Sequence, residues 1–217
     1  MTTANTTGKN YLSLKVVLNG DSGVGKSSLV ESMMRGVFNP NNIPTVGAAF
    51  YTKLFDVDNY KIKMEIWDTA GQERFKSLSS MYYNGSMGCF CVFSVMDAHT
   101  FEHITDWMNQ FDKVNRNIGD TVIFIVANQT DYDETKWAVT RESIEKLGNI
   151  SGCRIIYTTA KNSDDVRQMF VEIINEIIKK NPQVTNYNSN YTNINQRLHI
   201  KTIASPTTQD KQPSCSC

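Results

Sequence analysis

The feature that most constrains the fold is the segment GDSGVGKS at residues 20–27. It matches G-x₄-G-K-[ST], the pattern of a phosphate-binding loop, and it stands between an apolar run at 14–18 and a helical stretch at 26–34. Its glycines let the backbone curl so that N–H groups face phosphates, and the following helix start adds favourable polarity. Lys26 is expected to neutralise the β- and γ-phosphates, and the Ser27 hydroxyl to ligate Mg²⁺. The alternative, an incidental glycine-rich turn, is disfavoured by this strand and helix context.

The rest of the pattern alternates between strands and helices. The apolar runs predict strands at residues 14–18, 50–57, 61–67, 88–95, 122–127 and 154–158. Helical periodicity predicts helices at residues 26–34, 101–114 and 164–180. The second and third strands flank Asp58 and Asn59 and so form a hairpin, whereas the continuously apolar fourth and fifth are typical of a parallel sheet. We predict a doubly wound α/β domain, a mostly parallel six-stranded sheet with helices on both faces.

Three regions differ in composition. Residues 1–10 are polar and are expected to form a flexible extension, and residues 11–180 form the domain. From residue 181 to 217 the chain is rich in Asn, Gln, Ser and Thr, contains three prolines and has few large hydrophobic residues. Such a segment cannot bury enough apolar surface to fold, so we predict a disordered tail.

Charge and cysteine content indicate a cytosolic protein. Basic and acidic residues number 22 each, which gives no indication of a nucleic-acid partner. The polar N-terminus lacks the apolar stretch of a signal peptide, and the apolar runs are too short to span a bilayer. Cys89, Cys91 and Cys153 lie in strand-like runs and are interpreted as small core residues in a reducing compartment. Cys215 and Cys217 stand at the end of the chain.

A second motif, WDTAGQE at residues 67–73, follows the third strand. A carboxylate at the carboxyl end of a strand, level with the phosphate loop, can hold Mg²⁺ through water, which is the role expected of Asp68. Gly71 lets its backbone N–H approach the γ-phosphate, and Gln72 can orient a water for in-line attack. The alternative is an ordinary polar turn.

The two motifs together resemble those of the Ras-like small GTPases and, within them, the Rab family, with WDTAGQERF extending the second. The resemblance covers residues 12 to about 180. It implies a switch that binds GTP or GDP with Mg²⁺ and hydrolyses GTP slowly without an activating protein. IPTVG at residues 43–47 resembles the first switch, in which Thr45 closes over Mg²⁺. By the same matching, Phe38 packs on the guanine edge; the alternative is an ordinary core aromatic residue.

Base recognition is expected at the ends of the last strands. NQTD at residues 128–131 occupies the place of the family's Asn-Lys-x-Asp, and TAK at 159–161 resembles Ser-Ala-Lys. The Asp131 carboxylate can accept from the guanine N1–H and amine, which adenine cannot reciprocate. Ala160 N–H meets the guanine O6, and the Lys161 stem covers the ring. Gln129 in place of lysine departs from the pattern and puts nucleotide affinity in doubt.

The complete set of expected site residues follows. Nucleotide contacts are expected from Ser22, Gly23, Val24, Gly25, Lys26, Ser27, Ser28, Phe38, Thr45, Gly71, Asn128, Gln129, Asp131, Ala160 and Lys161. Mg²⁺ is expected at Ser27, Thr45 and Asp68, with Gln72 as the catalytic residue.

GAAF at residues 47–50 and MYY at 81–83 resemble the early-endosomal Rab branch. The resemblance implies that Phe50, Trp67 and Tyr82 form an exposed aromatic cluster that effectors recognise in the GTP-bound state. The alternative is that Phe50 and Trp67 are ordinary half-buried sheet residues.

The terminal CSC resembles the Rab Cys-x-Cys end, in which both thiols, here Cys215 and Cys217, receive geranylgeranyl groups. One lipid chain gives only marginal binding, and the tail has no polybasic patch to assist it. The resemblance implies an exchange factor, a GTPase-activating protein, a GDP-dissociation inhibitor and a prenylation escort protein as partners. We expect a monomer that regulates vesicular traffic, in the cytosol and on the cytoplasmic face of endosomal membranes.

Two other functions remain open. A phosphate-loop nucleotide kinase would need an arginine-rich lid, and no such cluster is visible in the sequence. A pseudo-GTPase would hold nucleotide without useful turnover; Gln72 argues against it, and Gln129 argues faintly for it.

Overall fold

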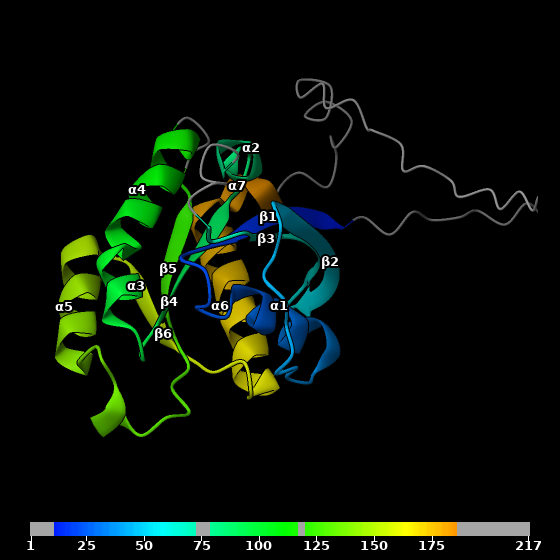
Figure 1. The fold of residues 1–217 in the computed structure, drawn as a ribbon. Coiled ribbons are helices and arrows are strands. Elements are labelled where there is room, and N and C mark those ends of the chain that lie inside the picture. The colour runs from blue at the N-terminus through cyan, green and yellow to red at the C-terminus, as the bar shows by residue number, and fades with distance from the viewer. Residues whose placement is uncertain (1–10, 73–78, 117–119, 186–217) are drawn as a thin grey trace, which may run out of the picture. The chain divides into compact units, whose positions relative to one another are not determined.

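The computed structural model describes residues 11–72, 79–116 and 120–185 (Figure 1). The predicted N-terminal extension, the tail beyond Thr185 and the two terminal cysteines lie outside the described residues. Within them, no helix is long and apolar enough to cross a membrane.

A six-stranded sheet forms the centre of the domain, with strand order β2-β3-β1-β4-β5-β6. The strands are β1 (Leu12–Asn19), β2 (Ala48–Val57), β3 (Tyr60–Thr69), β4 (Gly88–Ser94), β5 (Val122–Asn128) and β6 (Arg154–Tyr157). β2 pairs antiparallel with β3, and the other neighbours pair in parallel. The predicted α/β fold class is therefore confirmed. The order reverses at β1, which places the segment after β1 at the point where such sheets bind ligands.

Helices cover both faces of the sheet. They are α1 (Lys26–Arg35), α2 (Ser79–Tyr83), α3 (Ala98–Glu102), α4 (Ile104–Asn115), η2 (Glu134–Lys136), α5 (Arg141–Ser151), α6 (Ser163–Lys180) and α7 (Pro182–Thr185). One buried cluster contains residues of α1 and α6, and a second contains residues of α2, α4 and α5. Figure 1 shows α4 and α5 together on one flank, away from α1 and α6.

The side-chain alternation of β1 explains how one strand serves both faces. Leu14 and Val16 belong to the cluster beneath α1 and α6, whereas Val17 belongs to the cluster beneath α4. Because successive side chains of a strand point to opposite faces, a run that is apolar at every position is buried on both sides. In β4, Cys89 and Cys91 are fully buried in the second cluster, as their position in an apolar run predicted.

The helix predicted at residues 101–114 is two helices, α3 and α4, which meet at His103. His103 has φ −83° and ψ −7°, so the backbone stays close to helical values across the break. The apolar spacing therefore continues through it: Ile104, Trp107 and Phe111 are buried, while Phe101 and Met108 pack on the same cluster. The periodicity identified the apolar face correctly, but it could not detect the break.

Helices α2, α5, α7 and the short η2 were not predicted. Only Ile144 and Gly148 of α5 are buried, and Leu147 packs against the same cluster as Ile144, so the apolar face of the helix is narrow. Its ends do carry sequence signals, because the Thr140 side chain accepts from Ser143 N–H and Gly152 follows the last turn at φ 67°.

The predicted start of the disordered tail also differs from the structure. Asn181 is buried, and its Nδ2 donates to the Asp120 carbonyl over 2.9 Å and to the Ile177 carbonyl over 3.0 Å. The next residues form α7. The Asn181 side chain thus connects the end of α6 to Asp120, and regular structure continues past the composition change at residue 181.

Candidate functional site

The phosphate loop, residues 20–27, connects β1 to α1. Gly23 and Gly25 have φ of +83° and +93°, a backbone region that residues with a Cβ rarely adopt. A Cβ on Gly25 would also lie 2.4 Å from Asn128 Nδ2. The curled backbone therefore requires both glycines, and the close approach of Asn128 at the end of β5 requires Gly25 as well.

Lys26 lies at the start of α1 with its side chain folded into the loop. Its Nζ donates to the Gly20 carbonyl over 2.8 Å and to the Asp21 carbonyl over 2.7 Å. Burial lowers the pKa of Lys26 to about 8, against the attraction of Asp68 and Asp21, which acts to raise it. A buried ammonium group that hydrogen-bonds only to carbonyls gains from an anion placed beside it.

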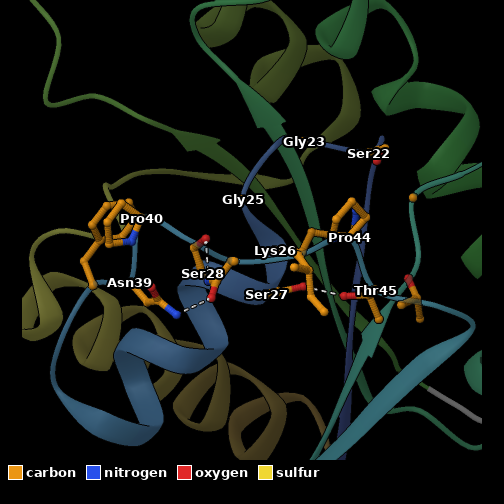
Figure 2. A pocket seen from close by; sticks show the side chains of 15 residues that line it. Ser22, Gly23, Gly25, Lys26, Ser27, Ser28, Asn39, Pro40, Pro44 and Thr45 are labelled. Atoms are coloured by element: carbon orange, nitrogen blue, oxygen red, sulfur yellow. Dashed lines mark hydrogen bonds between the residues drawn. The ribbon is translucent and has the colours of Figure 1, made fainter.

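A cavity of about 240 Å³ opens beside Lys26 (Figure 2). The predicted nucleotide-binding residues that line it are Ser22, Gly23, Gly25, Lys26, Ser27, Ser28, Phe38, Thr45 and Gly71. Asn39 and Asn42, which the sequence analysis did not select, line it too, and the Asn42 side chain donates to Ser28 Oγ over 3.1 Å. Residues of the phosphate loop and of the predicted first switch therefore line the same cavity.

Two hydroxyls of the cavity lining, those of Ser27 and Thr45, lie beside the buried carboxylate of Asp68, which is not part of the lining itself. Ser27 Oγ and Thr45 Oγ1 lie 2.7 Å apart, and Thr45 Oγ1 donates to Asp68 Oδ2 over 3.4 Å. Burial raises the pKa of Asp68, although hydrogen bonds from Ser27 and Thr45 and the charge of Lys26 oppose that rise. The other oxygen, Oδ1, is buried without a hydrogen-bond partner in the described part of the chain.

This donor set fits a hard divalent cation. Mg²⁺ prefers oxygen ligands and commonly combines one or two protein groups with water and phosphate oxygens. The two hydroxyls and the unsatisfied Asp68 oxygen provide such groups. Among the described residues, no cluster of three or more His, Cys, Asp or Glu side chains could hold a metal by itself. A cation here would depend on oxygens supplied by a ligand as well.

Gly71 lies directly against the phosphate loop. A Cβ at this position would be 2.2 Å from the Asp21 carbonyl carbon and 2.4 Å from the Ser22 nitrogen, so only glycine fits. Gln72 follows it, and its Oε1 is buried with no partner among the described residues. An amide left unsatisfied beside a ligand cavity is available to a bound molecule.

Apart from Phe38, which lines the cavity, the predicted base-binding residues are not part of its lining. Asn128 Nδ2 donates to the Val24 carbonyl over 2.7 Å, which joins the end of β5 to the phosphate loop. Val24 itself has a fully buried side chain, so only its backbone can face a ligand. Gln129 has φ 68°, and its Oε1 accepts from Ser94 Oγ over 2.5 Å.

Asp131, Thr159 and Lys161 form a hydrogen-bonded group. The Asp131 carboxylate accepts from Lys161 Nζ over 2.6 Å and from Thr159 Oγ1 over 2.7 Å. Burial alone would raise the pKa of Asp131, but these hydrogen bonds outweigh it and leave the pKa below its usual value. Lys161 Nζ lies 5.9 Å from the Phe38 ring centre, and Ala160 is buried. The structure thus brings Phe38 and these residues to one side of the loop.

The predicted effector residues form an aromatic cluster, Phe50, Trp67 and Tyr82. Phe50 and Trp67 lie opposite each other on β2 and β3, with ring centres 5.2 Å apart, and Trp67 and Tyr82 are 5.7 Å apart. Phe50 is 51% exposed, whereas the other two are half-buried. The cluster therefore combines sheet packing with an accessible aromatic surface.

The side-chain contacts of Asp21 and Ser94 were not predicted from the sequence. Asp21 is the second residue of the phosphate loop, and its carboxylate pairs with His103 and Trp107. Ser94 ends β4 and holds Gln129. The acidic residue inside the motif was a visible signal, but its partners lie more than 80 positions away in the sequence.

Comparison with known proteins places these features in context. The model of the family described as the Ras family matches residues 15–179. Ras-related protein SEC4 of Saccharomyces cerevisiae is 40% identical over 182 residues, which cover 82% of this chain and 82% of that protein. A probable Rab-related GTPase of Acanthamoeba polyphaga mimivirus is 39% identical, with 77% and 79% covered. Ras-related protein Rab-13 of Bos taurus is 38% identical, with 76% and 80% covered.

Proposed function

The chain belongs to the Ras family, within its Rab-type small GTPases, and from that premise we propose that it binds GTP or GDP with Mg²⁺ beside Lys26 and hydrolyses GTP as a switch in vesicular membrane traffic. The observation that carries this proposal is that Ser27 and Thr45, which line the same cavity as Lys26, lie together beside the buried Asp68 carboxylate. A phosphate-binding lysine and a magnesium-type donor set are combined there in one site.

The chemistry follows from how the residues are placed. Lys26 and the loop N–H groups bind the phosphates; Ser27 and Thr45 would ligate the cation, and Asp68 would hold it through water. Mg²⁺ would supply positive charge that offsets the negative charge of the phosphates. Gly71 N–H donates to the γ-phosphate, and Gln72 orients a water. Attack of that water forms a bond to the γ-phosphorus while the bond to the β–γ bridging oxygen breaks, which leaves GDP and phosphate.

Guanine selection is assigned to the residues beside the cavity. In this proposal the Asp131 carboxylate exchanges its bonds to Lys161 and Thr159 for the N1–H and amine of the base. Ala160 N–H meets O6, Asn128 keeps the segment against the phosphate loop, and the Lys161 stem covers the ring beside Phe38 and Gln129. A site built around a carboxylate rejects a base that lacks the matching donors.

Nucleotide competition tests the guanine assignment. GDP, IDP and ADP are compared as competitors for the Mg²⁺-loaded protein, because IDP lacks the 2-amine of guanine and ADP lacks both the 2-amine and N1–H. ADP should bind at least about a thousandfold more weakly than GDP, with IDP between them. In the Asp131→Ala variant, the affinities for GDP and IDP should be nearly equal. Equal affinity for ADP and GDP would remove the guanine assignment.

A single-turnover assay separates a working GTPase from a pseudo-GTPase. Gln72→Leu should slow phosphate release by about 10²-fold or more while GDP affinity is retained, because it removes the water-orienting amide and no phosphate contact. The matched control is Gln168→Leu, on the exposed face of α6, which should hydrolyse at the parental rate. If the parental chain releases no phosphate, even with an activating protein, the pseudo-GTPase alternative is correct.

The remaining proposals concern the membrane cycle. Two geranylgeranyl groups on Cys215 and Cys217 would anchor the chain to the cytoplasmic face of an endosomal membrane. The aromatic cluster would bind effectors in the GTP-bound state. An exchange factor, an activating protein, a GDP-dissociation inhibitor and a prenylation escort protein would complete the cycle. The motifs GAAF and MYY support the endosomal assignment.

A further inference from the structure

Asp21 is the one acidic side chain within the phosphate loop, and both its carboxylate oxygens are engaged by the helices that follow β4. Trp107 Nε1, on α4, donates to Oδ1 over 2.8 Å. His103 Nδ1, at the junction of α3 and α4, lies 2.7 Å from Oδ2. The Asp21 side chain is 18% exposed and that of His103 is 36% exposed. The loop is therefore attached to a helix junction far away in the sequence.

Asp21 also contacts the parts of the site that touch phosphate. Its carbonyl accepts from Lys26 Nζ over 2.7 Å, and its backbone lies against Gly71 so closely that no Cβ would fit there. Its carboxylate adds to the electrostatic potential felt by the Lys26 ammonium. A change in the charge or position of Asp21 is consequently transmitted to the lysine and to the glycine proposed to contact the γ-phosphate.

Of the two partners of Asp21 among the described residues, the His103 imidazole can donate as a neutral or as a cationic group, whereas the tryptophan N–H is always a neutral donor. The ring of His103 lies 4.3 Å from that of His99, centre to centre. His99 in turn lies 3.4 Å from Glu102, and Asp106 is in the first turn of α4. Within residues 11–72, 79–116 and 120–185, these groups, Asp21 in the loop and Lys26 behind it are the titratable groups that we identify around His103.

We infer that His103 is a positioning residue of the phosphate loop, which acts through Asp21 and makes nucleotide release depend on pH. This inference rests on the proposed function, that the cavity beside Lys26 holds a guanine nucleotide. A protonated His103 donates a charge-assisted hydrogen bond to Asp21 and offsets its negative charge. The phosphate loop is then held more firmly in position, and the electrostatic potential that it presents to the phosphates is more positive. A neutral His103 retains at most an ordinary hydrogen bond, so release is faster at higher pH.

The test measures release of N-methylanthraniloyl-GDP from the full chain with Mg²⁺, between pH 5.5 and 7.5, below the pKa of about 8 of Lys26. The parental rate should rise about three- to fivefold across this range, the difference expected between a charge-assisted and a neutral hydrogen bond at a partly exposed site. His103→Asn retains a donor near the position of Nδ1 without the charge. It should release at the parental high-pH rate at every pH.

Two further variants and a control complete the experiment. His103→Ala should release fastest, without pH dependence, and Asp21→Asn should lose the pH dependence although His103 is present. His99→Asn removes the neighbouring histidine, which does not touch Asp21, and should keep the parental profile. A parental profile in His103→Asn would overturn the inference. Failure of the parental chain to bind the labelled GDP would instead overturn the proposed function.

Discussion

The backbone of Gln129 lies in the left-handed region, at φ 68°, which side chains with a Cβ rarely adopt. Its Oε1 accepts from the hydroxyl of Ser94, and Ser94 Oγ accepts in turn from Met96 N–H over 3.1 Å. The amide is therefore held toward the end of β4. The family's lysine is expected at this position to lie along the base and to donate to the phosphate loop, so the glutamine uses its polar end for a different contact.

Gln129→Lys should release GDP about tenfold more slowly than the parental chain, because a charge-assisted hydrogen bond near the low end of its range is regained. Gln129→Met, with a similar apolar stem and no charge, is the matched control and should release at close to the parental rate. Ser94→Ala, measured separately, shows how much of any change comes from freeing the amide. An equal or faster rate in Gln129→Lys would mean that the site compensates elsewhere.

At the scale of elements, α6 joins the end of the base-binding segment to the middle of the sheet. Phe170 is fully buried, with its ring centre 5.0 Å from that of Phe90 in β4. Gly88 leaves room for the helix, since a Cβ there would lie 2.9 Å from the Cδ1 of Ile173. This contact fixes α6, whose first turn follows Lys161, relative to the sheet.

Phe170→Ala should lower the free energy of unfolding by about 3–5 kcal/mol, because it removes buried apolar surface and leaves a cavity that the sheet cannot fill. Urea unfolding of the GDP-bound protein measures this change in the free energy of unfolding. Arg167→Ala, on the exposed side of the same helix, is the control and should change stability by less than about 0.5 kcal/mol. A similar loss in both variants would show that α6 is not fixed by this aromatic contact.

At the scale of the whole molecule, the sheet separates two buried clusters and carries the candidate site at the carboxyl ends of its parallel strands. None of the helices in the described ranges is suited to cross a bilayer. In our proposal, membrane attachment rests on Cys215 and Cys217, whose CSC motif resembles the Rab Cys-x-Cys end.

Replacing both Cys215 and Cys217 by serine should move the protein from the membrane to the soluble fraction of cells. Either single replacement leaves one lipid chain, which binds membranes only marginally and reversibly, so the variant should be divided between the two fractions. Cys153→Ser changes a half-buried thiol of the domain and should leave the distribution unchanged. Membrane sedimentation of the doubly substituted chain at the parental level, or unmodified terminal cysteines on the membrane-bound form, would refute the anchor.

The sequence by itself determined the features that depend on neighbouring residues. The glycine spacing of GDSGVGKS requires a curled backbone. The continuously apolar runs at residues 88–95 and 122–127 are typical of buried parallel strands. The fold class could be predicted because these local patterns agree with one another. Element ends were less certain. His103 interrupts a continuous apolar face, and the apolar face of α5 is narrow.

Only the tertiary structure decided which distant side chains meet. The contacts of Asp21 with His103 and of Gln129 with Ser94 join residues 82 and 35 positions apart. No spacing rule reaches that far, because these distances depend on the order of the strands and on the way α4 packs against the sheet. The phosphate-binding part of the candidate site is therefore determined by residues that are close in the sequence. The contacts that orient the loop and hold Gln129 depend instead on how the strands and helices pack.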